Sequence, residues 1–213
     1  ISMGNVLNLG LGHLSISAWF KYSATANEFP QIVNKHGAGQ GYGIEIIDND
    51  GVNDGKVRAY IENASATRID ALSTATTAKD GNWHHVVATW DRAGNLIVYL
   101  DGTSGAGVSI STQSSDNILN SLEFDIGAAN NHTAQFFNGI VDEVAVWNKV
   151  LTAKEVKALY IGGLTFTAKN IQAGNLTGYW SMNQSSGITA TDSSANNNSG
   201  TLNNMTNASW TGT

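Results

Sequence analysis

Apolar and polar residues alternate along most of this 213-residue chain, in short segments that end at turn-forming residues. From Leu14 to Tyr22 the even-numbered residues are apolar and the odd-numbered ones mostly polar, which is the pattern of a half-buried β-strand. Strands joined by tight turns such as Asp101-Gly102 pair antiparallel, so the sequence predicts an all-β, antiparallel two-sheet jelly-roll sandwich. Further strands are predicted at residues 31–35, 42–47, 56–62, 68–72, 83–90, 96–100, 122–126 and 136–147.

One short helix is predicted near residues 152–160. Thr152 and Glu155 have the spacing of a capping box, in which each side chain binds the free backbone N–H of the other residue. Gly162-Gly163 supplies the left-handed stop. After Gly163 the alternation weakens, and it returns in one more predicted strand at residues 178–182.

The amino-acid composition limits the kinds of binding partner and the cellular locations that can be expected. Eleven Lys and Arg against seventeen Asp and Glu give a net charge of −6, which argues against binding to nucleic acid. No apolar run approaches the ~18 residues of a membrane span, so we expect no membrane insertion. An acidic, lysine-poor β protein is typical of bacterial and viral exteriors, which predicts an extracellular, cell-surface or virion location. Because the chain opens at Ile1 without a targeting pattern, we expect it to be part of a longer protein.

Four spaced stretches are informative together: Ile16–Lys21 (ISAWFK), Asp80–Val87 (DGNWHHVV), Val98–Gly102 (VYLDG) and Phe137–Asn148 (FNGIVDEVAVWN). In this order they resemble the laminin-G-like jelly roll domain of the concanavalin-A-like lectin/glucanase superfamily. The resemblance covers residues 1–163 and implies a concanavalin-A-like sandwich. It does not fix a function, because this fold carries lectins, adhesion modules, enzymes and spacers.

The two ends of the chain depart from the family pattern. A Tyr/Trp strand and an Asp-Ser-Ser-Gly-Asn-like loop open the family's domain, but here the matching residues, 178–181 and 192–202, come last. We therefore expect residues 1–163 to form a jelly roll without its opening strands, and residues 164–213 to be a connector plus strands. Those strands complete the same sandwich, exchange with a neighbouring chain or begin a following repeat. We predict antiparallel pairing of Tyr179–Met182 with Val144–Trp147, whose edge otherwise stays unpaired.

A calcium site is expected at the mouth of that strand. Asp142 shares parity with Val144 and Val146, so its carboxylate should point inward, where a charge is costly unless it is paired or metal-bound. The family places Ca²⁺ near this strand, and the resemblance implies a site formed by Asp142, Asp192, Asn196 and Asn198. The alternative is that Asp142 accepts backbone N–H bonds and binds no metal.

Long polar loops supply the candidate ligand contacts. Asp48, Asn49 and Asp50 open a hairpin tip, and Asn130 and Asn131 lie in a second polar loop. The spacing of acids in the hairpin tip is similar to that of a Ca²⁺ loop. It lacks the distal bidentate Glu, so a solvated tip is favoured.

Catalytic patterns are incomplete. Glu123 and Asp125 match the start of the Glu-x-Asp-x-Glu strand of the superfamily's retaining glucanases, but Gly127 replaces the third acid. His84 and His85 are neighbours on a strand, so they point to opposite faces and cannot bind one ion. We therefore expect that the chain is not an enzyme.

The sequence as a whole favours a non-catalytic binding module that recognises carbohydrate or a cell-surface ligand. Its partner would be a glycan or a surface glycoprotein, met as part of a larger extracellular or virion protein. The alternative is a structural or assembly repeat that binds no small ligand and stacks or exchanges strands with its neighbours. A glycoside hydrolase or lyase is the third hypothesis.

Overall fold

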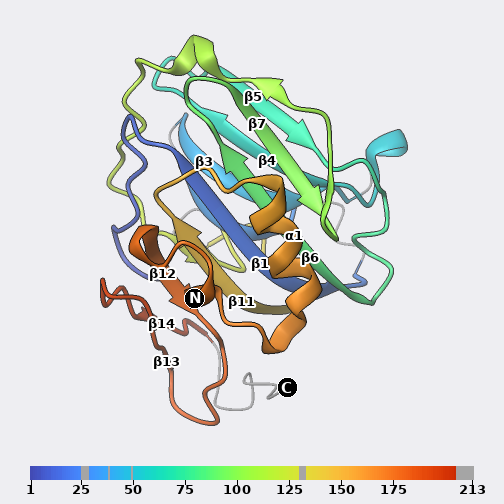
Figure 1. The fold of residues 1–213 in the computed structure, drawn as a ribbon, viewed down its shortest axis with the longest axis vertical. Helices are drawn as coiled ribbons and strands as arrows, with labels where there is room; N and C mark the ends of the chain where they lie inside the picture. Colours follow the sequence, from blue (N-terminus) through green and yellow to red (C-terminus); the bar gives the residue numbers. More distant parts are fainter. Residues whose placement is uncertain (25–28, 38, 49, 130–132, 205–213) are drawn as a thin grey trace.

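The computed structural model describes residues 1–24, 29–37, 39–48, 50–129 and 133–204. Two large antiparallel sheets are packed face to face, with one short α-helix lying against the outside of one of them (Figure 1). The predicted all-β jelly-roll sandwich is therefore confirmed.

The larger sheet has seven strands. In spatial order they are β12 (Leu176–Trp180), β11 (Gly139–Trp147), β1 (Leu14–Tyr22), β6 (Trp83–Trp90), β7 (Asn95–Leu100) and β8 (Thr103–Ser104), with β9 (Val108–Ser109) also paired to β7. Strands β1 and β11 are far apart in the sequence, but they lie side by side in this sheet and pair antiparallel with each other.

The second sheet has five strands in the order β10 (Asp125–Ile126), β2 (Gln31–Gly37), β3 (Gln40–Ile46), β4 (Val57–Glu62) and β5 (Arg68–Leu72). A small separate pair is formed by β13 (Thr189–Ala190) and β14 (Gly200–Thr201). Of the predicted strands, 122–126 is wrong in length, because only its last two residues pair with β2. The 3₁₀ turns are η1 (Gly51–Asn53), η2 (Ser111–Gln113), η3 (Gly163–Thr165), η4 (Ala168–Asn170) and η5 (Ala173–Asn175).

Alternation along the strands fills the space between the sheets. Ile16, Ala18 and Phe20 of β1 belong to one buried apolar cluster together with Ile44 of β3, and the alternate residues Ser17 and Trp19 face outward. Trp90 lies fully buried in the same cluster and donates from Nε1 to the Tyr60 carbonyl at 3.1 Å. This core between the sheets explains why a chain without cysteine needs no disulfide.

The helix α1 (Ala153–Gly162) covers part of the outer face of the seven-stranded sheet (Figure 1). Its predicted capping box is present, with Thr152 N donating to Glu155 Oε2 at 2.7 Å and Glu155 N to Thr152 Oγ1 at 3.3 Å. Val156 and Leu159 pack into a second apolar cluster with Trp147 of β11. In the described residues no helix is long and apolar enough to cross a membrane.

The segment after α1 returns to the seven-stranded sheet within the same chain. Strand β12 pairs antiparallel with β11, with Trp180 opposite Val144 and Tyr179 opposite Ala145, so the predicted pairing is confirmed for these residues. Trp180 is fully buried in the core and stacks on Phe124, with ring centroids 5.8 Å apart. The division into residues 1–163 and 164–213 as separate folding parts stays a prediction.

Candidate ligand-binding site

A layer of polar side chains covers the outer face of the five-stranded sheet. Glu45 of β3 lies opposite Arg58 of β4, and Tyr60 of β4 lies opposite Asp70 of β5. Residues directly opposite each other in an antiparallel pair have their side chains on the same face, so this register brings the polar residues together. Their neighbours on each strand, such as Ile44 and Ala59, face the core.

Glu45 is the centre of an ion-pair network. Its side chain is 2% exposed, and its Oε1 accepts from Arg58 Nε at 2.5 Å and from Arg68 Nη2 at 2.8 Å. Gln31 Nε2 donates to the other carboxylate oxygen, and Arg68 Nε donates to Asp70 Oδ1 at 2.7 Å. Two guanidiniums therefore balance two carboxylates, and the buried charge of Glu45 is compensated.

An aromatic ring lies beneath this network. The Arg68 guanidinium is 3.8 Å from the Tyr60 ring centroid, and the Tyr60 hydroxyl donates to Gln31 Oε1 at 3.0 Å and accepts from Asn34 Nδ2 at 2.7 Å. Burial raises the pKa of the Tyr60 phenol, which keeps it neutral. The close fit depends on Gly43, since a Cβ there would lie 2.5 Å from the Tyr60 hydroxyl oxygen.

The exposed atoms of this layer suit a polar, uncharged ligand. Side chains of Arg58, Arg68 and Asp70 are 16%, 30% and 34% exposed, so donors and acceptors in fixed positions reach solvent. Guanidinium and carboxylate groups make paired hydrogen bonds, and hydroxyl groups can both donate and accept them. We name this surface, formed by Glu45, Arg58, Tyr60, Arg68 and Asp70, the polar sheet face.

Sequence reasoning missed the polar sheet face. The signal was present as charged residues at alternate positions of Val57–Glu62 and Arg68–Leu72. Periodicity showed that each strand had a polar side, but only the register and the side-chain geometry show that Glu45 meets both Arg58 and Arg68.

The loop residues expected to contact a ligand differ in their exposure to solvent. Asp48 is buried, and its carboxylate accepts from Tyr22 OH and from Lys79 Nζ, each at 2.9 Å, so it holds the start of the hairpin tip in place. Asp50 is exposed in that tip. Asn49, Asn130 and Asn131 lie outside the described residues. A ligand contact at these loops stays a prediction.

The expectation that Asp142 points into the core is wrong. Asp142 lies opposite Trp19, whereas Ala145 lies opposite Ser17, so two residues of β11 stand against the single Ala18 of β1. The extra residue is Glu143, which has a left-handed φ of 51°. This β-bulge changes the parity of the strand, and Asp142 therefore shares the outer face with Trp19.

The four expected calcium ligands do not form a cage of oxygen atoms. Asp192 Oδ1 accepts from the backbone N–H groups of Tyr179 and Ser194, and its Oδ2 accepts from Ser194 Oγ and Asn198 N, all at 2.8–2.9 Å. The Nδ2 groups of Asn196 and Asn198 donate to backbone carbonyls of β12.

The Asp192 loop is thus closed by N–H and O–H donors, and the oxygens of its carboxylate are already engaged. Asp142 Oδ1 accepts the Glu143 N–H at 2.9 Å, as the alternative interpretation expected. Across the described part of the chain, no three His, Cys, Asp or Glu residues gather closely enough to hold a metal ion. With these hydrogen bonds in place the four residues do not fit Ca²⁺, and a melting experiment with and without calcium can test the expected site.

These observations define an all-β jelly-roll protein in which the charged side chains on the outer face of one sheet are paired with one another. The chain belongs to the Concanavalin A-like lectin/glucanases superfamily, whose Laminin_G_3 family matches residues 1–157.

Curated relatives cover a smaller part of the chain. A 96-residue stretch is 28% identical to the "Sushi, von Willebrand factor type A, EGF and pentraxin domain-containing protein 1" of Rattus norvegicus, and equally to that of Mus musculus. This stretch is 42% of the present chain and 3% of each relative, so the chain matches one small part of much longer proteins.

Solved structures show the same fold at low sequence identity. A putative carbohydrate binding protein from Bacteroides ovatus superposes with a TM-score of 0.64 and 18% identity over 91% of this chain and 55% of that one. The binding domain of Paraclostridial Mosquitocidal Protein 1 gives a TM-score of 0.58 and 17% identity over 74% of this chain and 39% of that one. At these identities the likeness concerns the fold alone.

Proposed function

We propose that this chain is a non-catalytic carbohydrate-binding module, and that the polar sheet face is its binding surface. One observation carries the proposal: charge-balanced donors and acceptors, fixed over an aromatic ring, remain partly open to solvent on a sheet face. Membership of a superfamily that includes lectins and the fold shared with a putative carbohydrate binding protein support it.

The charge balance favours a neutral glycan over an anionic one. Arg58 and Arg68 already share the Glu45 carboxylate, so an anionic sugar would have to compete with a buried ion pair. A neutral sugar can add hydrogen bonds to the exposed edges of Arg68 and Asp70 without separating them.

A binding role is also favoured over a catalytic one. Both carboxylate oxygens of Glu45 are occupied by two guanidiniums and an amide, so the group is poorly placed to contact a leaving group. The pairing of β12 with β11 inside one chain supports a binding module over a repeat that exchanges strands with its neighbours. The partner on this proposal is a glycan or a surface glycoprotein, at an extracellular, cell-surface or virion location.

A glycan array followed by titration of the best neutral ligand tests the proposal. Arg68→Lys keeps the positive charge but loses the bidentate hydrogen bonding of the guanidinium and its stacking over Tyr60. The affinity for the glycan should therefore fall about tenfold or more. Asp70→Asn should weaken binding similarly. Asp91→Asn, which removes a charge from the turn between β6 and β7, is the control and should bind as the parent does. A silent array, or variants that bind like the parent, would overturn the proposed function.

A further inference from the structure

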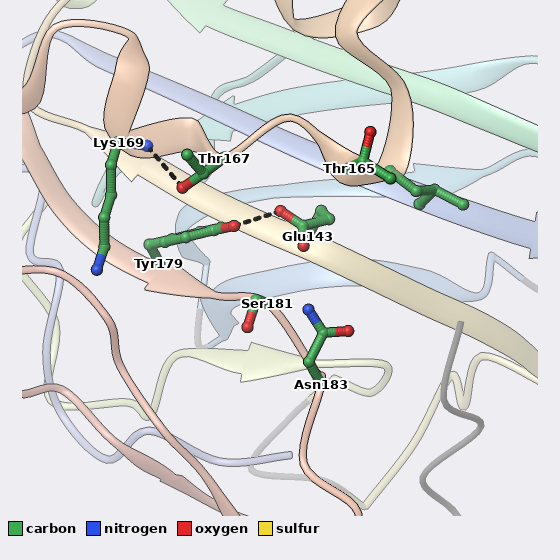
Figure 2. Close-up of a pocket in the computed structure, with 8 residues that line it drawn as sticks. Glu143, Thr165, Thr167, Lys169, Tyr179, Ser181 and Asn183 are labelled. Carbon is green, nitrogen blue, oxygen red and sulfur yellow. Dashed lines mark hydrogen bonds between the residues drawn. The ribbon is translucent and has the colours of Figure 1, made fainter.

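A pocket of about 430 Å³ lies on the outer face of the other sheet, beside β11 and β12 and under the connector that follows α1 (Figure 2). Its volume is in the range of small-molecule sites. The residues that line it are Glu143, Leu164, Thr165, Thr167, Lys169, Tyr179, Ser181 and Asn183.

The bulge in β11 explains why an acid, Glu143, lines this pocket and has Asp142 next to it in the strand. It places Asp142 on the outer face opposite Trp19, and Glu143 beside it reaches Tyr179 of β12. The Tyr179 hydroxyl donates to Glu143 Oε2 at 2.5 Å, and Figure 2 shows the second carboxyl oxygen directed toward the side of the pocket where Ser181 and Asn183 lie. One acceptor of this carboxyl group therefore faces the pocket.

Neither acid has a cationic partner among the described residues. Asp142 and Glu143 are only 6% and 7% exposed, and neither forms an ion pair there. Lys169 lines the pocket, but its ammonium group points away from Glu143 in Figure 2. Burial, with Asp142 alongside, raises the pKa of Glu143 to about 7, which is consistent with a carboxyl group that lacks a counter-charge.

The remainder of the lining is rich in hydroxyl and amide groups. Thr165, Thr167, Ser181 and Asn183 supply both donors and acceptors, and Leu164 is the one aliphatic side chain among the lining residues. Such a lining suits a polyhydroxylated molecule, whereas the uncompensated Glu143 carboxyl group suits a positive charge.

We propose that this pocket binds an amino sugar with a free ammonium group, which sits against Glu143 with its hydroxyls toward Ser181, Asn183 and the threonines. An ammonium group has three donors and no acceptor, and the carboxylates offer only acceptors. Bound there, it compensates the charge that no described side chain compensates. The inference does not rest on the proposed function, because the two sites share no residue.

An NMR titration of the labelled chain with three sugars tests this pocket. Glucosamine should shift the backbone amides of Tyr179, Ser181 and Asn183, whereas N-acetylglucosamine and glucose, which lack the charge, should bind at least tenfold more weakly. Glu143→Gln keeps the shape and removes the charge, so it should weaken glucosamine binding at least tenfold and remove the preference among the three sugars. Equal responses to the three sugars would contradict the proposal.

Two further variants keep the result interpretable. Asn183 is exposed, so Asn183→Leu removes an amide from the pocket without disturbing the core, and it should weaken glucosamine binding even if Glu143→Gln does not fold. Asp91→Asn removes one negative charge, as Glu143→Gln does, but at a position away from the pocket, and it should leave binding intact. Arg68→Lys should also leave it intact, which separates this site from the polar sheet face. Unchanged glucosamine binding by both pocket variants would overturn the proposal.

Discussion

Glu45 and Glu143 lie on the outer faces of the two sheets and are both more than nine-tenths buried, yet their surroundings are opposite. Glu45 accepts hydrogen bonds from two arginines and a glutamine. Glu143 has the Tyr179 hydroxyl as its donor and Asp142, another acid, alongside. Burial of a carboxylate therefore does not define its role; the presence of a counter-charge does.

This contrast also gives the two faces different capacities. The polar sheet face is a neutral, preorganised set of donors and acceptors, while the pocket beside β11 is lined by one acid, Glu143, which gains from a cation or from a proton. Substitution of the two glutamates should accordingly change the stability of the fold in opposite directions.

The largest effect is expected from removal of residues 164–213. Strand β12 and its buried Tyr179 and Trp180 are lost, so the pocket loses a wall and β11 becomes an edge strand. Burial of two aromatic side chains is worth about 3–6 kcal/mol in total, and the truncated chain should aggregate or lose this much stability in a denaturant titration. A residue 1–163 fragment that is soluble, monomeric and equally heat-stable would show that the tail belongs elsewhere.

Glu45→Gln should have the next largest effect. Without the carboxylate, Arg58 and Arg68 are held together on the polar sheet face with Asp70 as their remaining acid. Breaking a buried ion pair on one side costs about 3–5 kcal/mol, and the partial exposure of both arginines places the expected loss near the lower value. Urea unfolding measures it. A loss below about 1 kcal/mol would mean that the network contributes little.

Glu143→Gln should act in the opposite direction and depend on pH. The pKa of Glu143 is raised from 4.5 to about 7 in the folded chain, so between these values the unfolded chain ionises while the folded one stays protonated. The wild-type chain should therefore lose about 3 kcal/mol of stability as pH rises from 4 to 8, relative to the variant. The difference between the two unfolding curves isolates this group. Equal pH profiles would show that Glu143 is not buried as an uncompensated acid.

The fold could be predicted from sequence because local signals agree with it. Alternation located β1, a nearly continuous apolar run located β6, and the Thr152–Glu155 spacing located α1. The resemblance to the family's opening strand, together with the otherwise unpaired edge, located the partner of β11. The first three signals lie within a few residues of the elements that they define, so one sequence is enough to find them.

The candidate sites could not be predicted in the same way. The face of the sheet on which Asp142 lies depends on one extra residue in β11. That residue, Glu143, has a left-handed backbone conformation that its residue type does not predict. The partners of Glu45 depend on the register of three strands and on side-chain reach: Arg58 lies directly opposite Glu45, whereas Arg68 lies opposite Glu62 and reaches Glu45 with its guanidinium. Both errors of expectation arise from register, which periodicity alone does not determine.

The smallest effect is expected from calcium. The Asp192 carboxylate accepts hydrogen bonds from four N–H and O–H donors, which a cation would have to displace. Asp142 lies on the same face of the sheet as Trp19, and a cation at its carboxylate would have to compete with the Glu143 N–H. A ligand stabilises a fold only in proportion to its occupancy of the folded state. Melting curves with millimolar CaCl₂ and with EDTA should therefore coincide, and the glycan array should give the same result in both. A rise of several degrees with CaCl₂ that Asp142→Asn abolishes would restore the calcium site, and it would mean that the acids beside β11 have a metal as their missing counter-charge.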